Sequence, residues 1–204
     1  IIIAGDPKSV FLEIYFKSLK KNQFKSPLIL IVNENILLKQ MRALKYDFEI
    51  NKLDIDNLIH KNLNNKKINI IHVPFDKKFI SEYIYQSFEK ALFLTKKDKE
   101  INLINGPINK KKILKQKFLG ITEYLDFKTK SKGKTVMLIY NKDLAVSPLT
   151  THLPLKKVHK FISKRKIINH VQQISNFYKK KFNILPNIGI TGLNPHCESC
   201  LLYT

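Results

Sequence analysis

The chain has 204 residues and a formal net charge of +21, from 37 Lys and Arg against 16 Asp and Glu. Hydrophobic residues make up 44% of the chain, and 6 Gly and 8 Pro are too few for a collagen-like, low-complexity or disordered protein. The apolar runs are far shorter than the ~20 residues that cross a bilayer, so we expect a soluble protein that does not contact membranes. This length suits one large domain or two small ones.

The two ends of the chain carry signals about location. Cys197 and Cys200 lie too close together in the sequence for a disulfide between them to stabilise a fold of this size, which favours a reducing cytoplasm over an oxidising compartment. The first residues, Ile1–Ala4, resemble a strand rather than a signal peptide, and no initiator Met precedes them. We therefore expect a cytoplasmic protein, and a fragment that continues at both ends.

A charge of +21 makes nucleic acid a candidate partner, because Lys and Arg neutralise phosphates. The lysines, however, are scattered along the chain and do not alternate with aromatic residues as a base-stacking platform would. A general bias of the amino-acid composition toward Lys, Asn and Ile explains the charge more simply than a nucleic-acid-binding surface does. A basic nucleic-acid-binding module is therefore kept only as the alternative, and no nucleic acid is expected as a partner.

The first half of the chain alternates short apolar runs with helical patterns. Apolar residues recur at helical spacing in Val10–Leu19 and Ser81–Leu94. Continuous apolar runs, typical of parallel strands covered on both faces, are expected to form buried strands at 1–4, 27–32, 68–73 and 101–104. The β-α-β-α order predicts an α/β fold.

The second half predicts further strands and helices. We place a domain boundary at Leu119-Gly120, where a Gly ends a lysine-rich helical stretch, which gives domains 1–119 and 120–204. The expected elements after it are strands at 135–140, 144–147 and 186–191 and helices at 155–161 and 167–179, with a turn at 141–143.

Two loops of this half each carry a histidine. Thr150–Pro154 and Thr191–His196 each follow an expected strand, and ligands of open α/β sheets bind at the carboxyl ends of strands. Imidazole nitrogen suits Zn, Ni, Co or Fe, and a catalytic metal needs about three protein ligands. His152 and His196 are thus candidate ligands of one divalent metal, although a single loop histidine is more often an ordinary surface residue.

Other junctions carry weaker signals. Asn105–Lys110 joins a strand to a helix, and Lys110 near the helix start could meet a phosphate or carboxylate. Gly120–Glu123 opens the next helix, where Thr122 could cap the helix or contact a phosphate. The Cys197–Cys200 pair is half of a zinc site at most, and no Rossmann glycine pattern is present.

Taken in order, these junctions resemble the 4-hydroxythreonine-4-phosphate dehydrogenase family of vitamin B6 biosynthesis. Its pattern is a G-E-P-x-G turn, T-G-P-[IV]-[NH]-K, G-H-T-E, T-T-H-[IL]-P and G-L-N-P-H-A-G-E. The matching segments, in the same order and at similar spacing, are Gly5-Asp6-Pro7, Asn105–Lys110, Gly120–Glu123, Thr150–Pro154 and Gly192–His196.

The resemblance implies an isocitrate/isopropylmalate-dehydrogenase-like fold, with two α/β domains flanking a cleft and the second domain incomplete. It implies a homodimer that uses NAD and a divalent metal, Zn, Mg or Co, to oxidise and decarboxylate 4-phosphooxy-L-threonine to 3-amino-2-oxopropyl phosphate. The resemblance implies that His152 and His196 bind the metal and take part in catalysis. It also implies that Lys110 is catalytic and that Ile121 and Thr122 contact the substrate.

This chain also departs from the family pattern. Ile121 replaces the family histidine beside Thr122, which removes a donor to the substrate phosphate. A third metal ligand and most of the cofactor-binding segment are expected beyond Thr204. A paralogous dehydrogenase of 4-phospho-threonate or 4-phospho-erythronate therefore stays open as an alternative.

Overall fold

The computed structural model describes residues 1–56, 58, 63–98, 100–110, 118, 120–131 and 135–193. It divides into two compact units, Ile1–Lys117 (unit 1) and Phe118–Thr204 (unit 2). The expected boundary at 119/120 differs from this division by two residues and stays a prediction as a domain boundary. In the described part of the chain, no helix is both long and apolar enough to cross a membrane.

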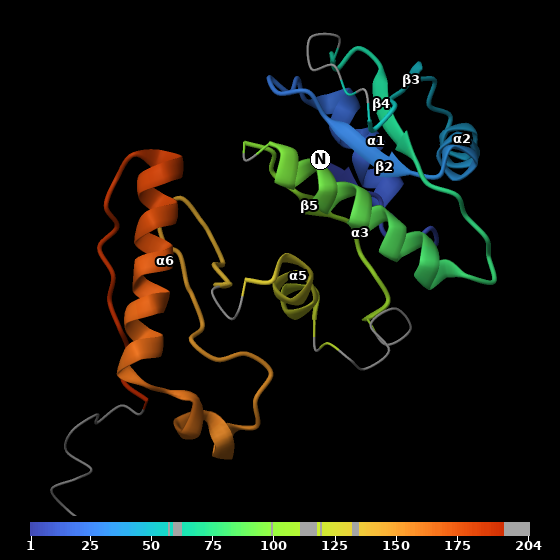
Figure 1. The fold of residues 1–204 in the computed structure, drawn as a ribbon. Coiled ribbons are helices and arrows are strands. Elements are labelled where there is room, and N and C mark those ends of the chain that lie inside the picture. The colour runs from blue at the N-terminus through green and yellow to red at the C-terminus, as the bar shows by residue number, and fades with distance from the viewer. Residues whose placement is uncertain are drawn as a thin grey trace, which may run out of the picture. The chain divides into compact units, whose positions relative to one another are not determined.

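Unit 1 is built on a five-stranded parallel sheet in the order β3-β4-β2-β1-β5 (Figure 1). The apolar, β-branched runs form its central strands, as expected of parallel strands that are buried on both faces. The strands are β1 (Ile2–Ile3), β2 (Ile29–Val32), β3 (Ile50–Lys52), β4 (Ile68–His72) and β5 (Ile104–Asn105).

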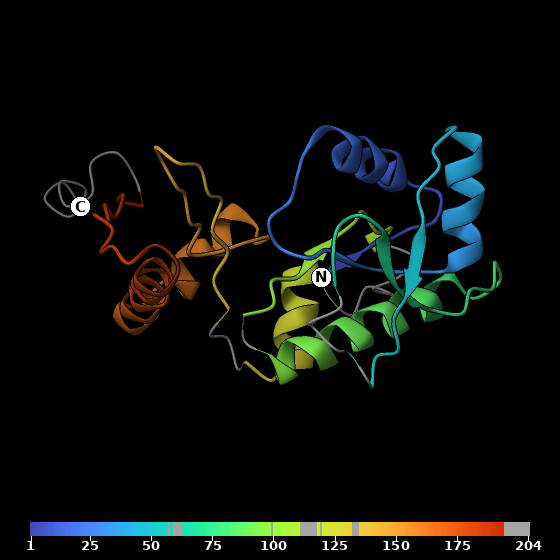
Figure 2. The same cartoon turned by 90° about the horizontal axis from the view of Figure 1, so that it is seen from above.

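Helices cover both faces of this sheet (Figure 2). Helices α1 (Phe11–Lys21) and α2 (Glu34–Ala43) share one buried cluster with alternate strand residues such as Leu30 and Ile70. Because side chains alternate along a strand, the residues between them point to the other face, where α3 (Ile80–Lys97) packs against β1 and β2. This doubly wound arrangement confirms the α/β fold class.

The sequence analysis did not predict helix α2 or strand β3, and Asn33 explains how this part of the chain folds. Its side chain accepts a hydrogen bond from the Ile36 backbone N–H at 3.2 Å and so caps α2. Its amide also donates to the Val73 carbonyl at 2.9 Å, which ties the start of α2 to the end of β4. Helix α2 then returns the chain to the outer strand β3.

Unit 2 contains helices α5 (Ile121–Thr129) and α6 (Lys164–Phe182) and the 3-10 helix η2 (Leu155–Phe161). The expected helices at 155–161 and 167–179 are present, although the first is a 3-10 helix. The expected strands at 135–140 and 144–147 are wrong as full strands, because they share a single antiparallel bridge between Ile139 and Val146. The expected strand at 186–191 is also wrong, since this segment has no bridge partner among the described residues.

The segment 135–147, which we call the ribbon, runs beside α6 (Figure 1). Tyr140 stacks on Phe182 with ring centroids 5.4 Å apart, and it also contacts the Tyr178 ring. The Ser147 hydroxyl donates to the Met137 carbonyl and lies 2.6 Å from Nε2 of His170. A few ring contacts and this polar network therefore join the ribbon to α6.

The His170 network predicts a pH dependence. Burial, followed by the nearby Lys166 charge, lowers the pKa of His170 below its ordinary value of 6.5. The unfolded chain then binds more protons than the folded one, so the stability of unit 2 falls as the pH drops below about 6.5. We expect His170→Gln to flatten this decline, measured as the urea midpoint of unit 2 between pH 7 and 5. An unchanged pH slope in the variant would contradict the assignment.

Candidate functional site

The sheet order defines a switch point in unit 1. From β1 the chain moves to β2 on one side, and β5 later joins β1 on the other side. The loops that leave β1 and β5 therefore diverge at their carboxyl ends, where ligands of open α/β sheets bind. The two glycine junctions of the sequence, Gly5-Asp6-Pro7 and Asn105–Lys110, are these loops.

The two loops approach each other through their backbones. The Asp6 N–H donates to the Pro107 carbonyl at 2.8 Å, and the Gly106 N–H donates to the Ile3 carbonyl at 2.7 Å. A Cβ on Gly5 would lie 2.4 Å from the Pro107 oxygen, and one on Gly106 would lie 2.4 Å from the Ala4 oxygen. Gly5 also has φ +77°, which favours glycine. Only glycine at both positions allows this contact.

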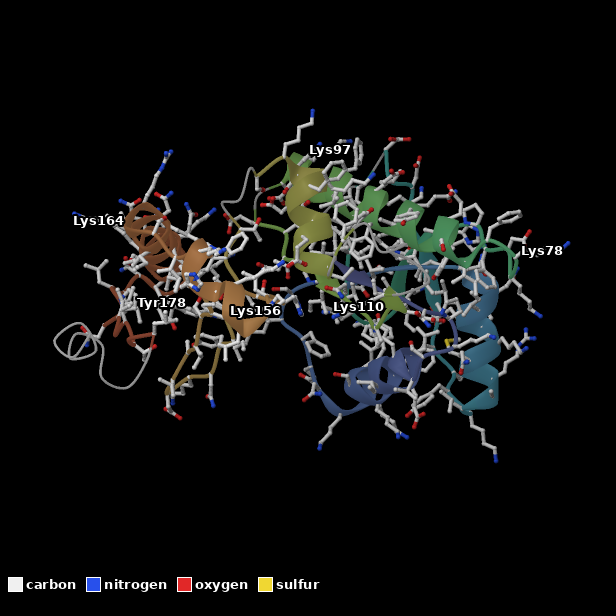
Figure 3. The ribbon with its side chains drawn as sticks, turned by 90° about the horizontal axis from the view of Figure 1, so that it is seen from below. Lys78, Lys97, Lys110, Lys156, Lys164 and Tyr178 are labelled. Carbon is white, nitrogen blue, oxygen red and sulfur yellow. The ribbon has the colours of Figure 1, made fainter. Side chains whose placement is uncertain are left out.

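The polar side chains at this junction differ in role. Asp6 accepts a hydrogen bond from the Lys8 N–H at 2.9 Å through Oδ1, and its carbonyl accepts one from the Ser9 N–H. Asp6 therefore holds the turn that leads into α1. Lys110, labelled in Figure 3, is exposed, so its ammonium is open to an anion.

In unit 2, the start of α5 differs from the starts of two other helices. The side chains of Asn33 and Ser163 accept backbone N–H groups at the starts of α2 and α6. At the start of α5, Gly120 has no side chain and no side chain caps the helix, as is also the case for α1 and α3. Within the described residues, no side-chain acceptor bonds the first N–H groups of α5, although the Glu123 carboxylate of the same turn has a buried Oε2 beside Gly120. The positive end of the helix dipole favours an anion at this position.

The predicted substrate residues lie in this first turn. Thr122 is exposed, whereas Ile121 is half-buried. Tyr124 anchors the turn, because it is buried and its ring meets the Phe118 ring edge-on at 5.5 Å. Thr122 therefore presents a hydroxyl at an uncapped helix start, while Ile121 offers no hydrogen-bond donor from its side chain.

His152 has an unusual backbone. Its φ is +56°, in the left-handed region where non-glycine residues are uncommon, a conformation shared in this chain by Lys45, Lys130 and Asn183, and its side chain is exposed. His196, the second predicted ligand, lies outside the described residues. The loop of His152 follows the ribbon rather than a full strand, so its expected placement at a strand end is wrong. The strand expected before His196, at 186–191, is likewise absent from the described residues. No three His, Cys, Asp or Glu side chains gather within the described ranges.

One polar cluster at the carboxyl edge of the sheet was missed. Nδ1 of His72, at the end of β4, accepts the Glu34 backbone N–H at 3.3 Å. The Glu34 carboxylate in turn forms an ion pair with Lys52 at 2.8 Å. The sequence analysis did not single out His72, and its place at the end of an expected strand was the signal that could have marked it.

Comparison with known proteins decides the family. The family model described as "Pyridoxal phosphate biosynthetic protein PdxA" matches residues 23–203. The chain belongs to this family. The fold agrees, since a crystal structure of 4-hydroxythreonine-4-phosphate dehydrogenase from Klebsiella pneumoniae has a TM-score of 0.80 at 20% identity, covering 99% of this chain and 66% of that one.

Relatives within the PdxA family match over different lengths. A 4-hydroxythreonine-4-phosphate dehydrogenase from Hydrogenobaculum sp. is 27% identical over 96% of this chain, which covers 64% of the relative. Another, from Sulfurihydrogenibium sp., is 43% identical over 82 residues, which cover 40% of this chain and 25% of the relative. The chain thus spans less than two thirds of these relatives.

Proposed function

We propose that this chain contributes to an NAD-dependent 4-hydroxythreonine-4-phosphate dehydrogenase that acts in the cytoplasm as a homodimer. The reaction oxidises the secondary alcohol of 4-phosphooxy-L-threonine and then releases CO₂ from the resulting β-keto acid, which yields 3-amino-2-oxopropyl phosphate. Membership of the PdxA family and the names of the relatives support this proposal.

The observation that carries the proposal is the uncapped start of α5. A phosphorylated substrate needs donors for its phosphate oxygens, and α5 offers first-turn N–H groups, its dipole and the exposed Thr122 hydroxyl. The phosphate would thereby fix one end of the substrate. The exposed Lys110 is the candidate for neutralising the substrate carboxylate or an oxygen that gains charge.

The imidazole of His152 would supply one of the ligands that a divalent metal requires. Its imidazole is exposed, and neutral imidazole is a common metal ligand. The described residues alone do not complete a ligand set, so His196 is proposed as the second ligand. When bound, such a metal would stabilise negative charge on the substrate oxygen, and NAD would accept the hydride.

We expect Thr122→Ala to weaken binding of the phosphorylated substrate by roughly tenfold to a hundredfold, because a hydrogen bond to a charged group contributes roughly 1.5–3 kcal/mol. Calorimetric titration of the substrate measures the dissociation constant without turnover. Thr129→Ala is the matched control, since Thr129 is at the opposite end of α5 and bonds the Leu125 carbonyl at 2.7 Å. Equal affinity in both variants would contradict the proposed phosphate site.

Ile121 supports a second candidate within the same chemistry. Its half-buried aliphatic side chain stands where the family histidine would donate to the phosphate. A paralogue acting on 4-phospho-threonate or 4-phospho-erythronate shares the phosphate but lacks the amine of the first substrate. Tighter binding of either sugar acid than of 4-phosphooxy-L-threonine would favour this alternative.

A further inference from the structure

The end of β5 carries the one Asn–Gly pair of the sequence, Asn105–Gly106 (Figure 1). An asparagine loses its amide most readily when glycine follows it, because glycine has no side chain to hinder attack by its own backbone nitrogen. The family pattern T-G-P-[IV]-[NH]-K has threonine at this position, so the pair is a feature of this chain rather than of the pattern. Asn105 is therefore a candidate for spontaneous modification.

Packing requires the glycine of this pair. A Cβ on Gly106 would lie 2.4 Å from the Ala4 oxygen and 2.8 Å from the Ala4 carbonyl carbon. Both atoms belong to the backbone that leaves β1, so no side-chain rotation makes room for a larger residue. Because Gly106 is fixed in this way, the residue at position 105 decides whether the pair is reactive.

The side chain of Asn105 lies beside the peptide that would attack it. Its Nδ2 donates a hydrogen bond to the Gly106 carbonyl at 3.3 Å, which holds the side-chain amide next to the Gly106 peptide group. Asn105 is also exposed, so water reaches the amide. The reacting groups and the water that the modification consumes are thus both at hand.

The nitrogen of Gly106 is, however, engaged in the sheet. Its N–H donates to the Ile3 carbonyl at 2.7 Å, and the Ile104 N–H donates to the Ile1 carbonyl at 2.8 Å, so β5 is held to β1 on both sides of Asn105. The nitrogen must give up its proton to attack, and a hydrogen bond at the short end of the usual range retains that proton. Reaction therefore requires β5 to separate from β1, which is a local opening of the fold.

We propose that Asn105 is a deamidation site, which pairing of β5 with β1 protects and which opening of this junction exposes. In the opened loop the Gly106 nitrogen attacks Cγ of Asn105. The N–Cγ bond forms, the Cγ–Nδ2 bond breaks, and the proton of the attacking nitrogen passes through solvent to the departing ammonia. Water then opens the cyclic imide at either carbonyl, which gives aspartate or isoaspartate with no change of oxidation state.

Either product changes the junction permanently. Aspartate adds a negative charge to the loop that carries Lys110. Isoaspartate adds a methylene group to the backbone before Gly106, which displaces the N–H that bonds the Ile3 carbonyl. A chain that has opened and reacted therefore does not re-form the same switch point.

The test follows loss of the Asn105 amide by peptide mass spectrometry, in the folded chain and in urea at the same pH. We expect deamidation in urea to be about tenfold or more faster than in the folded chain, because only opened molecules react. Asn105→Gln keeps an amide but needs a larger ring, so it should stay unmodified in urea. The internal control is Asn102, an exposed asparagine followed by Leu103, which should react far more slowly.

A second variant loosens the junction without urea. Gly5→Ala places a Cβ 2.4 Å from the Pro107 oxygen and 2.8 Å from the Gly106 carbonyl carbon. This clash should speed deamidation of the folded chain about tenfold, with amide exchange of β2 and β4 showing that the sheet persists. Gly189→Ala is the matched control, since its Cβ meets no atom within 4 Å, and it should leave the rate unchanged.

The parent chain gives an independent measurement if Gly5→Ala does not fold. At low urea concentrations its deamidation rate should rise in step with hydrogen exchange of the Gly106 amide, because both need the same opening. Absence of deamidation in urea, equal rates in the folded and unfolded chain, or a rate that does not follow this exchange would overturn the inference. None of these readouts uses a substrate, so the inference and the proposed function can fail separately.

Discussion

Replacing Gly106 by alanine is expected to destabilise unit 1 by about 3 kcal/mol or more, which is a large share of the ~5–15 kcal/mol that holds a domain folded. The new Cβ would lie 2.4 Å from the Ala4 oxygen and 2.8 Å from the Ala4 carbonyl carbon. Both atoms belong to backbone at the end of β1, so no side-chain rotation relieves the clash. The loss of stability is measured as the shift in the urea midpoint of unit 1, with its unfolding monitored by amide hydrogen exchange in β1 and β2.

Gly189→Ala is the control for this substitution. A Cβ at Gly189 would meet no atom within 4 Å, so its replacement is expected to change stability by less than about 0.5 kcal/mol. A Gly106→Ala protein as stable as Gly189→Ala would show that the loops after β1 and β5 do not pack as described. It would also remove the structural basis for placing a ligand site at this switch point.

His152→Ala is expected to lower turnover about a hundredfold or more while leaving the fold intact, because loss of even a supporting group of a metal ligand costs roughly 10–100-fold. The exposed loop position of His152 contributes little packing, so the free energy of unfolding of unit 2 should change by about 1 kcal/mol or less. Binding of Co²⁺ or Zn²⁺, measured by calorimetry, should weaken in parallel with turnover.

His159→Ala provides the matched control. His159 is an exposed histidine of η2 in the same unit, and it matches no motif of the family. Its replacement should change neither metal affinity nor turnover. If the two variants behave alike, His152 is a surface residue and the proposed metal site is wrong.

The fold of unit 1 was largely predictable from local pattern. Continuous β-branched runs such as Ile29–Val32 form strands because both of their faces meet helices. The sequence analysis missed α2 because its signal is the cap at Asn33 followed by a short apolar stripe, rather than a long amphipathic period. In unit 2 the same kind of run, 135–140, forms only one bridge. Strand pairing depends on a neighbouring segment, which a local pattern does not identify.

The candidate site was predictable as separate pieces rather than as an assembly. Motif residues identified the glycine turns, and the structure shows why they need glycine at positions 5 and 106. The uncapped start of α5 around Thr122 became evident only in contrast with the caps of α2 and α6. The left-handed backbone of His152 has no sequence signal, because φ is set by the loop around it.

The most direct test of the proposed function is NADH formation from 4-phosphooxy-L-threonine with NAD and a divalent metal, with and without a chelator. The assay is run on the folded protein and on its His152→Ala and His159→Ala variants. We expect metal-dependent NADH formation that is lost on His152→Ala and kept on His159→Ala. A folded protein that binds the substrate but forms no NADH, or forms it equally without His152, would contradict the proposed function.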